Sequence, residues 1–287
     1  AGDFDPKEAV AMIEKYWGKY KAKKMPTWKV EPQPVLEKTD VREVYGIEKE
    51  RVQIGWRLGG ATSEQAMLGR LAANVLYNKK AGLIDINLVQ QQQVSENSSA
   101  GSWSANDFSF FYMYGEPRKL QELEDVKDLL FKELGKLKNG QFEDWVLEAV
   151  VNDLEYREIK SRENPNGRAY SMMDAFIYEQ EWKDVCDEFT KMRQYTKEDV
   201  INFAKEFLKE ENCAIIYKRE GQDTNVLKVD KPKITPVELR RDTFSDFRTA
   251  LMEMPEVRQA PVFLDFKQSI QHQPLASGVP MDYIHNA

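Results

Sequence analysis

Histidine and cysteine are scarce in this chain of 287 residues, which has two of each. Both histidines, His272 and His285, stand near the end of the chain, thirteen residues apart. A catalytic zinc site takes three protein ligands and an open position, and two histidines on neighbouring helical turns need a spacing of three or four. The two cysteines, Cys186 and Cys213, are too few for a disulfide framework, and the sequence leaves open whether they pair. By its own residues, the chain is poorly equipped for metal-dependent chemistry.

An excess of basic residues and long apolar runs are also missing. With 41 Lys and Arg against 48 Asp and Glu, the net charge is −7, which argues against a general nucleic-acid binder. No run of 18 apolar residues occurs, so we expect no membrane span. The glycine-rich loops that bind nucleotides and the Gly-x-Ser-x-Gly elbow of serine hydrolases are absent. The hydrophobic fraction of 41% is nevertheless sufficient for a core.

Periodicity predicts strands and helices along the middle of the chain. Arg51–Leu58 alternates polar and apolar residues, as a half-buried strand does, and Leu120–Lys138 places leucines at helical spacing. Further strands are predicted at 40–47, 90–103 (long and bent), 108–114 and 213–217, and further helices at 62–80, 142–161, 168–180, 182–192, 196–210 and 244–253. The order predicts an α+β fold with an antiparallel (mixed) β-sheet and helices packed on one face. The two adjacent strand pairs suggest antiparallel pairing within each pair.

Several short motifs, in their order, resemble the pitrilysin/insulinase family of zinc metallopeptidases, the inverzincins. The motifs are Gly2–Pro6 before a helix that ends in Tyr16-Trp17-Gly18, a Pro-rich stretch with Pro26, Pro32 and Pro34, the strands Arg51–Leu58 and Cys213–Tyr217, and the later segments Ile234–Pro236, Leu264–Phe266 and Gly278–Asn286. The resemblance implies a processing-peptidase-like domain. It divides the chain into the end of a preceding domain (1–36), a non-catalytic second domain of the N-terminal half (37–230), and a connector towards the second half of a longer parent (231–287).

The resemblance implies that the catalytic apparatus lies outside this chain. The family's His-x-x-Glu-His motif belongs to its first domain and is absent here, so zinc is implied for the parent and no metal or catalytic residue is carried over. The family's C-terminal half also offers an Arg and a Tyr to the substrate, but the matching region, 83–103, contains neither. Whether the chain belongs to an active enzyme is therefore open. The parent's substrate would be a peptide or unfolded polypeptide, and the chain's partners would be the parent's remaining domains.

Three side chains are candidates for substrate binding. The amides of Gln91 and Gln93 offer hydrogen bonds to a peptide backbone, although a solvated strand edge is the more common explanation of such residues. Trp103, with the aromatic residues of Phe108–Tyr114, could line a substrate chamber, although such a stripe is more often sheet core. Carboxylates on the helix at 142–161 could do acid/base work, but the basic residues among them favour a salt-bridged surface.

Two other hypotheses remain. The chain could come from a non-catalytic homologue that acts as a binding or structural subunit of a peptidase-like complex, which the upstream sequence of the parent would reveal. It could also be an unrelated α+β module, whose N-terminal helix at 5–17 should then pack intimately on the rest. If the helix has lost its own domain, we expect it to dock on the second domain or on a neighbouring molecule. The compartment stays open, with the cytoplasm and the periplasm both compatible.

Overall fold

The computed structural model describes residues 2–25, 31, 33–94, 97–224, 230, 232–236, 243–256, 260, 265, 268 and 270–284, in two units, Ala1–Val226 and Leu227–Ala287. Pro26, Pro32, Leu264, Phe266 and His285, on which parts of the sequence interpretation rest, lie outside the described residues. In the described part of the chain, no helix has the length and apolar character needed to cross a membrane.

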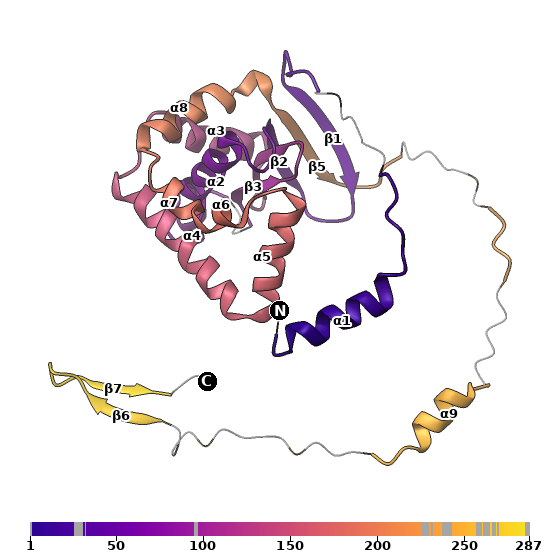
Figure 1. Cartoon of the computed structure of the whole chain (residues 1–287). Coiled ribbons are helices and arrows are strands. Elements are labelled where there is room, and N and C mark those ends of the chain that lie inside the picture. Colours follow the sequence, from indigo (N-terminus) through magenta and orange to yellow (C-terminus); the bar gives the residue numbers. More distant parts are fainter. Residues whose placement is uncertain are drawn as a thin grey trace. The chain divides into compact units, whose positions relative to one another are not determined.

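The first unit contains a five-stranded sheet and most of the helices (Figure 1). Its strands are β1 (Asp40–Gly46), β2 (Arg51–Leu58), β3 (Ser99–Ser104), β4 (Ser109–Gly115) and β5 (Ala214–Glu220). Its helices are α1 (Pro6–Trp17), α2 (Glu64–Leu76), the π-helix η1 (Asp85–Gln90), α3 (Leu123–Lys138), α4 (Trp145–Glu163), α5 (Pro165–Ile177), α6 (Trp182–Cys186), α7 (Glu188–Met192), α8 (Lys197–Phe207) and the short 3₁₀ turn η2 (Glu210–Asn212). The predicted α+β class is confirmed.

The sheet has the order β1-β5-β2-β4-β3 and is mixed. β1 runs parallel to β5, whereas the β5–β2, β2–β4 and β4–β3 pairs are antiparallel. The expected antiparallel pairing of β3 with β4 is confirmed. The expected pairing of β1 with β2 is wrong, because β5 lies between them. β5 buries Ile215 and Tyr217, while β1 is largely exposed, so the more apolar strand takes the interior position.

The core lies between one face of the sheet and the helices that cover it. On β2, Val52, Ile54, Trp56 and Leu58 point to this face, and all are buried. Helices α2 and α3 pack on it, and α8 packs on both of them. The Trp56 indole donates its N–H to the Lys209 carbonyl at 2.7 Å, which gives the one polar atom of this side chain a partner inside the core. The alternation seen in the sequence is therefore the core-facing side of a central strand.

The segment predicted as a long strand from Gln90 to Trp103 is largely something else. Its first part belongs to η1 and the turn that follows, and β3 begins only at Ser99. Ile84, Leu88 and Val94 are buried in the core, which draws the chain into a helical turn here. Leu83 and Ile84 are already helical and lead directly into η1.

The N-terminal helix α1 begins as expected, with the Asp5 side chain accepting the N–H groups of Lys7 and Glu8 at 2.7 and 3.3 Å. None of its residues is buried, and Trp17 is 70% exposed. The expectation that it docks on the second domain is therefore not met, nor is the intimate packing expected of an unrelated module.

The second unit contains the helix α9 (Asp246–Glu253), which confirms the helix predicted at 244–253, and a hairpin of β6 (Gln271–Pro274) and β7 (Pro280–Tyr283). In the hairpin, His272 Nδ1 and Asp282 Oδ1 are 2.5 Å apart. This histidine is thus engaged with a cross-strand neighbour.

Candidate functional site

Gln91 and Gln93 lie in the exposed turn that follows η1, not on a strand. The Gln93 amide donates to the carbonyl of Gln91 at 3.3 Å, and the Gln93 carbonyl accepts from the Gln121 side chain at 3.0 Å. These two hydrogen bonds hold the turn together and connect it to the segment between β4 and α3. The idea that a glutamine-lined strand edge offers its amides to a peptide loses its structural basis, because these residues form no strand.

Trp103 lies on β3 and points to the face of the sheet opposite the helices, which we call the open face. Its indole is half exposed and stacks with Phe110 and Phe108, with ring centroids 5.3 and 6.0 Å apart. Tyr112 continues this row along β4, at 5.8 Å from Phe110, and its ring occupies the space that a Cβ at Gly101 would need. The aromatic stripe of the sequence therefore divides between two faces.

The core receives the alternate residues Phe111 and Met113, which are fully buried. The structure does not bring the three predicted site residues together. Trp103 stands beside the β3–β4 turn, whereas Gln91 and Gln93 precede the other end of β3.

β3 is the last strand of the sheet and has a free edge. At the β3–β4 turn, the Ala105 N–H donates to the Phe108 carbonyl at 2.8 Å. Because backbone groups alternate in direction along a strand, those of Ala100, Ser102 and Ser104 point away from β4. The Tyr178 hydroxyl donates to the Ser104 carbonyl at 3.2 Å, which agrees with this orientation. Among the described residues, no other hydrogen bond reaches this edge.

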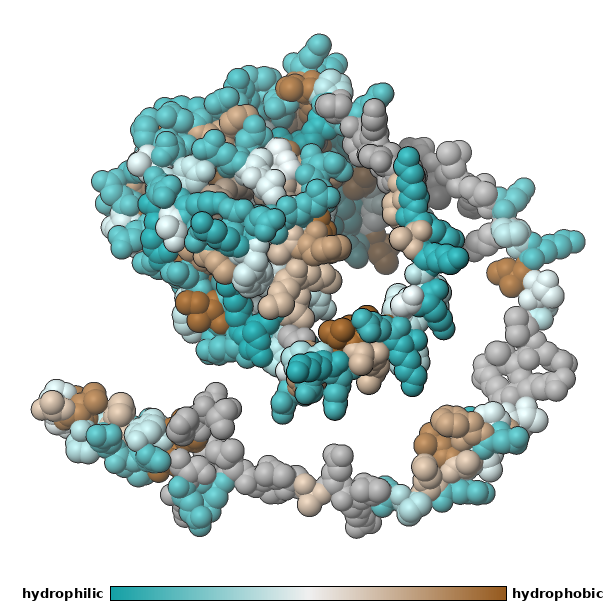
Figure 2. Space-filling model, in the orientation of Figure 1, coloured by the Kyte–Doolittle hydropathy of each residue, from teal (hydrophilic) through white to brown (hydrophobic). Residues whose placement is uncertain are grey.

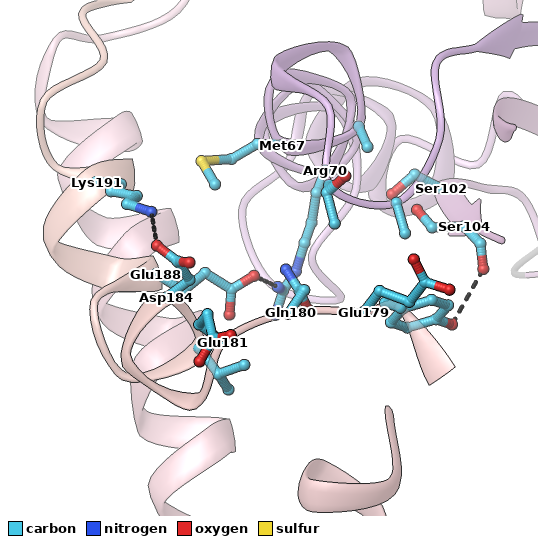
Figure 3. Close-up of a pocket in the computed structure, with 15 residues that line it drawn as sticks. Met67, Arg70, Ser102, Ser104, Glu179, Gln180, Glu181, Asp184, Glu188 and Lys191 are labelled. Atoms are coloured by element: carbon cyan, nitrogen blue, oxygen red, sulfur yellow. Dashed lines mark hydrogen bonds and ion pairs between the residues drawn. The ribbon is translucent and has the colours of Figure 1, made fainter. Parts of the chain in front are cut away.

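A pocket of about 550 Å³ lies along the free edge of β3 (Figure 3). Its walls come from α2, from β3 through Ser102 and Ser104, and from the segment between the end of α5 and α7. Ser102 and Ser104 are in register with Phe111 and Ser109, which are buried, so the pocket lies on the helix-covered side of the edge. An incoming strand would thus meet backbone groups at the edge, the pocket on one face and Trp103 on the other.

Two ion pairs cross the pocket lining. Arg70 Nη1 lies 2.7 Å from Glu188 Oε1 and connects α2 to α7, and Lys191 Nζ lies 2.7 Å from Asp184 Oδ1. The hydrogen bond between Lys191 and Asp184 lowers the pKa of the carboxyl and raises that of the ammonium. Both cations of the pocket are therefore held by carboxylates, while the lining also contains Glu179 and Glu181.

The pocket residues were not found by sequence reasoning. Arg70, Ser102 and Glu188 are far apart in the sequence, and no spacing joins them. From the sequence alone, Tyr178–Glu181 is expected to be no more than a connection between two predicted helices. Its one unusual property, a left-handed backbone at Glu179 (φ 53°), becomes visible only in the structure.

The described residues contain no group of three or more His, Cys, Asp and Glu side chains that could hold a metal ion. The zinc implied for the parent therefore does not fit the residues described here, and no chemical step is assigned through it. The carboxylates of α4 form the expected salt-bridged surface: Asp144 pairs with Lys197 at 2.8 Å, Asp153 with Lys80 at 3.0 Å and Glu155 with Arg193 at 2.5 Å.

Three solved structures with the same fold are distant from this chain in sequence. A protease from Helicobacter pylori has a TM-score of 0.69 at 15% identity, over 76% of this chain and 54% of its own. A peptidase M16 inactive domain from Pseudomonas fluorescens has a TM-score of 0.62 at 12% identity, over 79% and 54%. The periplasmic protease PqqL from Escherichia coli has a TM-score of 0.58 at 14% identity, over 100% and 34%. The chain thus spans about half the length of the first two structures.

No curated protein sequence matches the chain. The family model described as "Peptidase M16 inactive domain" matches residues 1–154, more than half of the chain. This match agrees with the resemblance to the pitrilysin family, with the shared fold and with the absence of a metal-binding group among the described residues. The chain belongs to the peptidase M16 family, as one of its inactive domains.

Proposed function

We propose that this chain is the non-catalytic part of a zinc-dependent metalloendopeptidase, in which it forms chamber wall and binds the extended peptide substrate. In this proposal, residues 1–36 end the preceding domain, 37–230 are the inactive domain, and 231–287 lead towards the second half of the parent. Hydrolysis and zinc belong to other domains of the parent, which are the partners of this chain.

The free edge of β3 is the observation that carries the proposal. An extended peptide that pairs with this edge gains main-chain hydrogen bonds from the N–H and C=O of Ser102 and from the N–H of Ser104, which depend little on its sequence. Trp103 adds an exposed aromatic surface on the open face, next to the same edge. Of the three residues first considered for substrate binding, Trp103 keeps this role, whereas Gln91 and Gln93 are at most contacts near the other end of the strand.

The test is binding of a short, fluorescein-labelled, unstructured peptide to the purified chain, followed by fluorescence anisotropy. Ser102→Pro removes an N–H that points away from β4, and proline is tolerated on an edge strand in this orientation. We expect Ser102→Pro and Trp103→Ala to weaken peptide binding, with melting temperatures close to that of the unsubstituted chain. Trp145→Ala is the matched control, because this tryptophan is 60% exposed on α4, outside the edge and the pocket.

A second measurement uses the same peptide N-methylated at alternate residues. Methylation in the register that faces β3 should abolish binding, and methylation in the other register should not. Unchanged affinity of both methylated peptides and of Ser102→Pro contradicts strand addition. Zinc-dependent cleavage of the peptide by the pure chain contradicts the assignment of catalysis to other domains.

A further inference from the structure

On the basis of the function proposed above, the charges that line the pocket beside β3 indicate which peptide side chain binds at this edge. Six charged side chains line it: Arg70, Glu179, Glu181, Asp184, Glu188 and Lys191. Four carboxylates against two cations leave an excess of two negative charges. Because Arg70 and Lys191 are paired with Glu188 and Asp184, the excess resides on Glu179 and Glu181.

Glu179 and Glu181 both line the pocket, from the segment between α5 and α6 (Figure 3). Among the described residues, neither carboxylate forms an ion pair. The backbone of Glu179 is left-handed (φ 53°), a conformation in which glycine or asparagine is more stable. The carboxylate is therefore held beside the pocket at some cost in local stability.

Ser102 and Ser104 line the same pocket and add two hydroxyl groups to its polar lining. These groups suit a long cationic side chain, which has an apolar stem and several N–H donors.

The geometry of strand pairing determines what stands on either side of that residue. Successive side chains of a strand point to opposite faces. A peptide paired with β3 that places one side chain in the pocket therefore places its two neighbours on the open face, next to the exposed Trp103 indole. The Tyr178 hydroxyl, which occupies the Ser104 carbonyl, marks the end of the pairing.

We propose that the pocket binds the Lys or Arg side chain of an extended peptide paired with β3, and that the apolar neighbours of this residue contact Trp103. The preferred substrate is thus a basic residue between two apolar ones, in an unfolded segment. Glu179 and Glu181 provide the charge preference, and the edge of β3 provides the affinity common to all peptides.

The experiment compares three labelled peptides that differ only at one central residue, Lys, Gln or Glu, with apolar flanks, on the full chain at low salt. We expect the Lys peptide to bind about tenfold more tightly than the Glu peptide, since two partly exposed charges each contribute up to about 1 kcal/mol. The double variant Glu179→Asn, Glu181→Gln should bind all three equally, at the affinity of the Gln peptide. Asparagine suits the left-handed backbone, so the fold should be kept.

Charge reversal provides the sharper comparison. Glu179→Lys with Glu181→Lys should prefer the Glu peptide, whereas the control Glu148→Gln, on the exposed side of α4, should keep the preference for Lys. If the unsubstituted chain binds all three peptides with equal affinity, the proposed preference for a basic residue is refuted, whereas the proposed function still stands. Failure of all three peptides to bind contradicts the proposed function itself.

Discussion

Burial separates the two cysteines at the scale of single residues. Cys186 is exposed, whereas Cys213 is fully buried at the start of β5 and donates to the Glu210 carbonyl at 3.0 Å. Burial, followed by the nearby Glu210 charge, raises the pKa of the Cys213 thiol from 9.0 to about 11. Both cysteines are free, so the question that the sequence left open is answered, and Cys213 acts as a small apolar residue.

We predict that a disulfide reagent at pH 8 modifies one thiol in the folded chain and two after unfolding in guanidinium. The Cys213 thiol is protonated in the folded state up to about pH 11, but ionises near pH 9 once unfolded. Its contribution to the free energy of unfolding is therefore complete below pH 9 and is lost as the pH rises towards 11. Cys213→Ala should flatten this part of the stability curve. Rapid reaction of both thiols in the folded chain would show that Cys213 is accessible.

Among the secondary-structure elements, α8 shows how far local sequence determines a boundary. Thr196 and Asp199 form a capping box at its start, in which the Thr196 N–H donates to Asp199 Oδ2 at 2.7 Å and the Asp199 N–H donates to Thr196 Oγ1 at 3.2 Å. Thr196→Ala should lower the free energy of unfolding by about 1 kcal/mol in urea titrations. Thr190→Ala, an exposed position on α7, is the control and should stay within about 0.5 kcal/mol. Equal effects of the two would mean that the cap contributes nothing.

Patterns within one element were predictable, and pairings between distant elements were not. The alternation of Arg51–Leu58 and the leucine spacing of α3 gave a strand and a helix at nearly the observed residues. The parallel pairing of β1 with β5 joins residues more than 170 positions apart, and nothing local indicates it. At 90–94, the polar run of glutamines predicted a strand that faces solvent, whereas the chain turns here between the buried side chains of Leu88 and Val94.

The candidate site was predictable only in part for the same reason. Trp103 was found because an aromatic residue near a strand is visible in the sequence. The pocket was missed because it forms where α2, the edge of β3 and the turn after α5 meet. The same holds for the charge balance of its lining, which depends on the pairs Arg70–Glu188 and Lys191–Asp184.

At the scale of the whole molecule, the buried residues among those described form one core and all lie between Val52 and Tyr217. The segment before β1 is bound to this part of the chain through Leu36, whose N–H donates to Asn212 Oδ1 at 3.1 Å, and through Gln33 and Pro34, whose carbonyls accept from Arg57 at 3.0 and 2.9 Å. We predict that residues 31–230 fold alone and melt, by circular dichroism, at the temperature of the full chain. A fall of several degrees would show that α1 or the second unit contributes to the stability of the core.

The free edge of β3 has a consequence for how the protein behaves at high concentration. Edge strands are commonly protected by lysine, proline or a bulge against pairing with another molecule. The sequence of β3, Ser-Ala-Gly-Ser-Trp-Ser, contains neither lysine nor proline. A second copy of the chain offers the same strand, so we expect edge-to-edge dimers in concentrated solutions, and fewer of them once a peptide is bound as proposed.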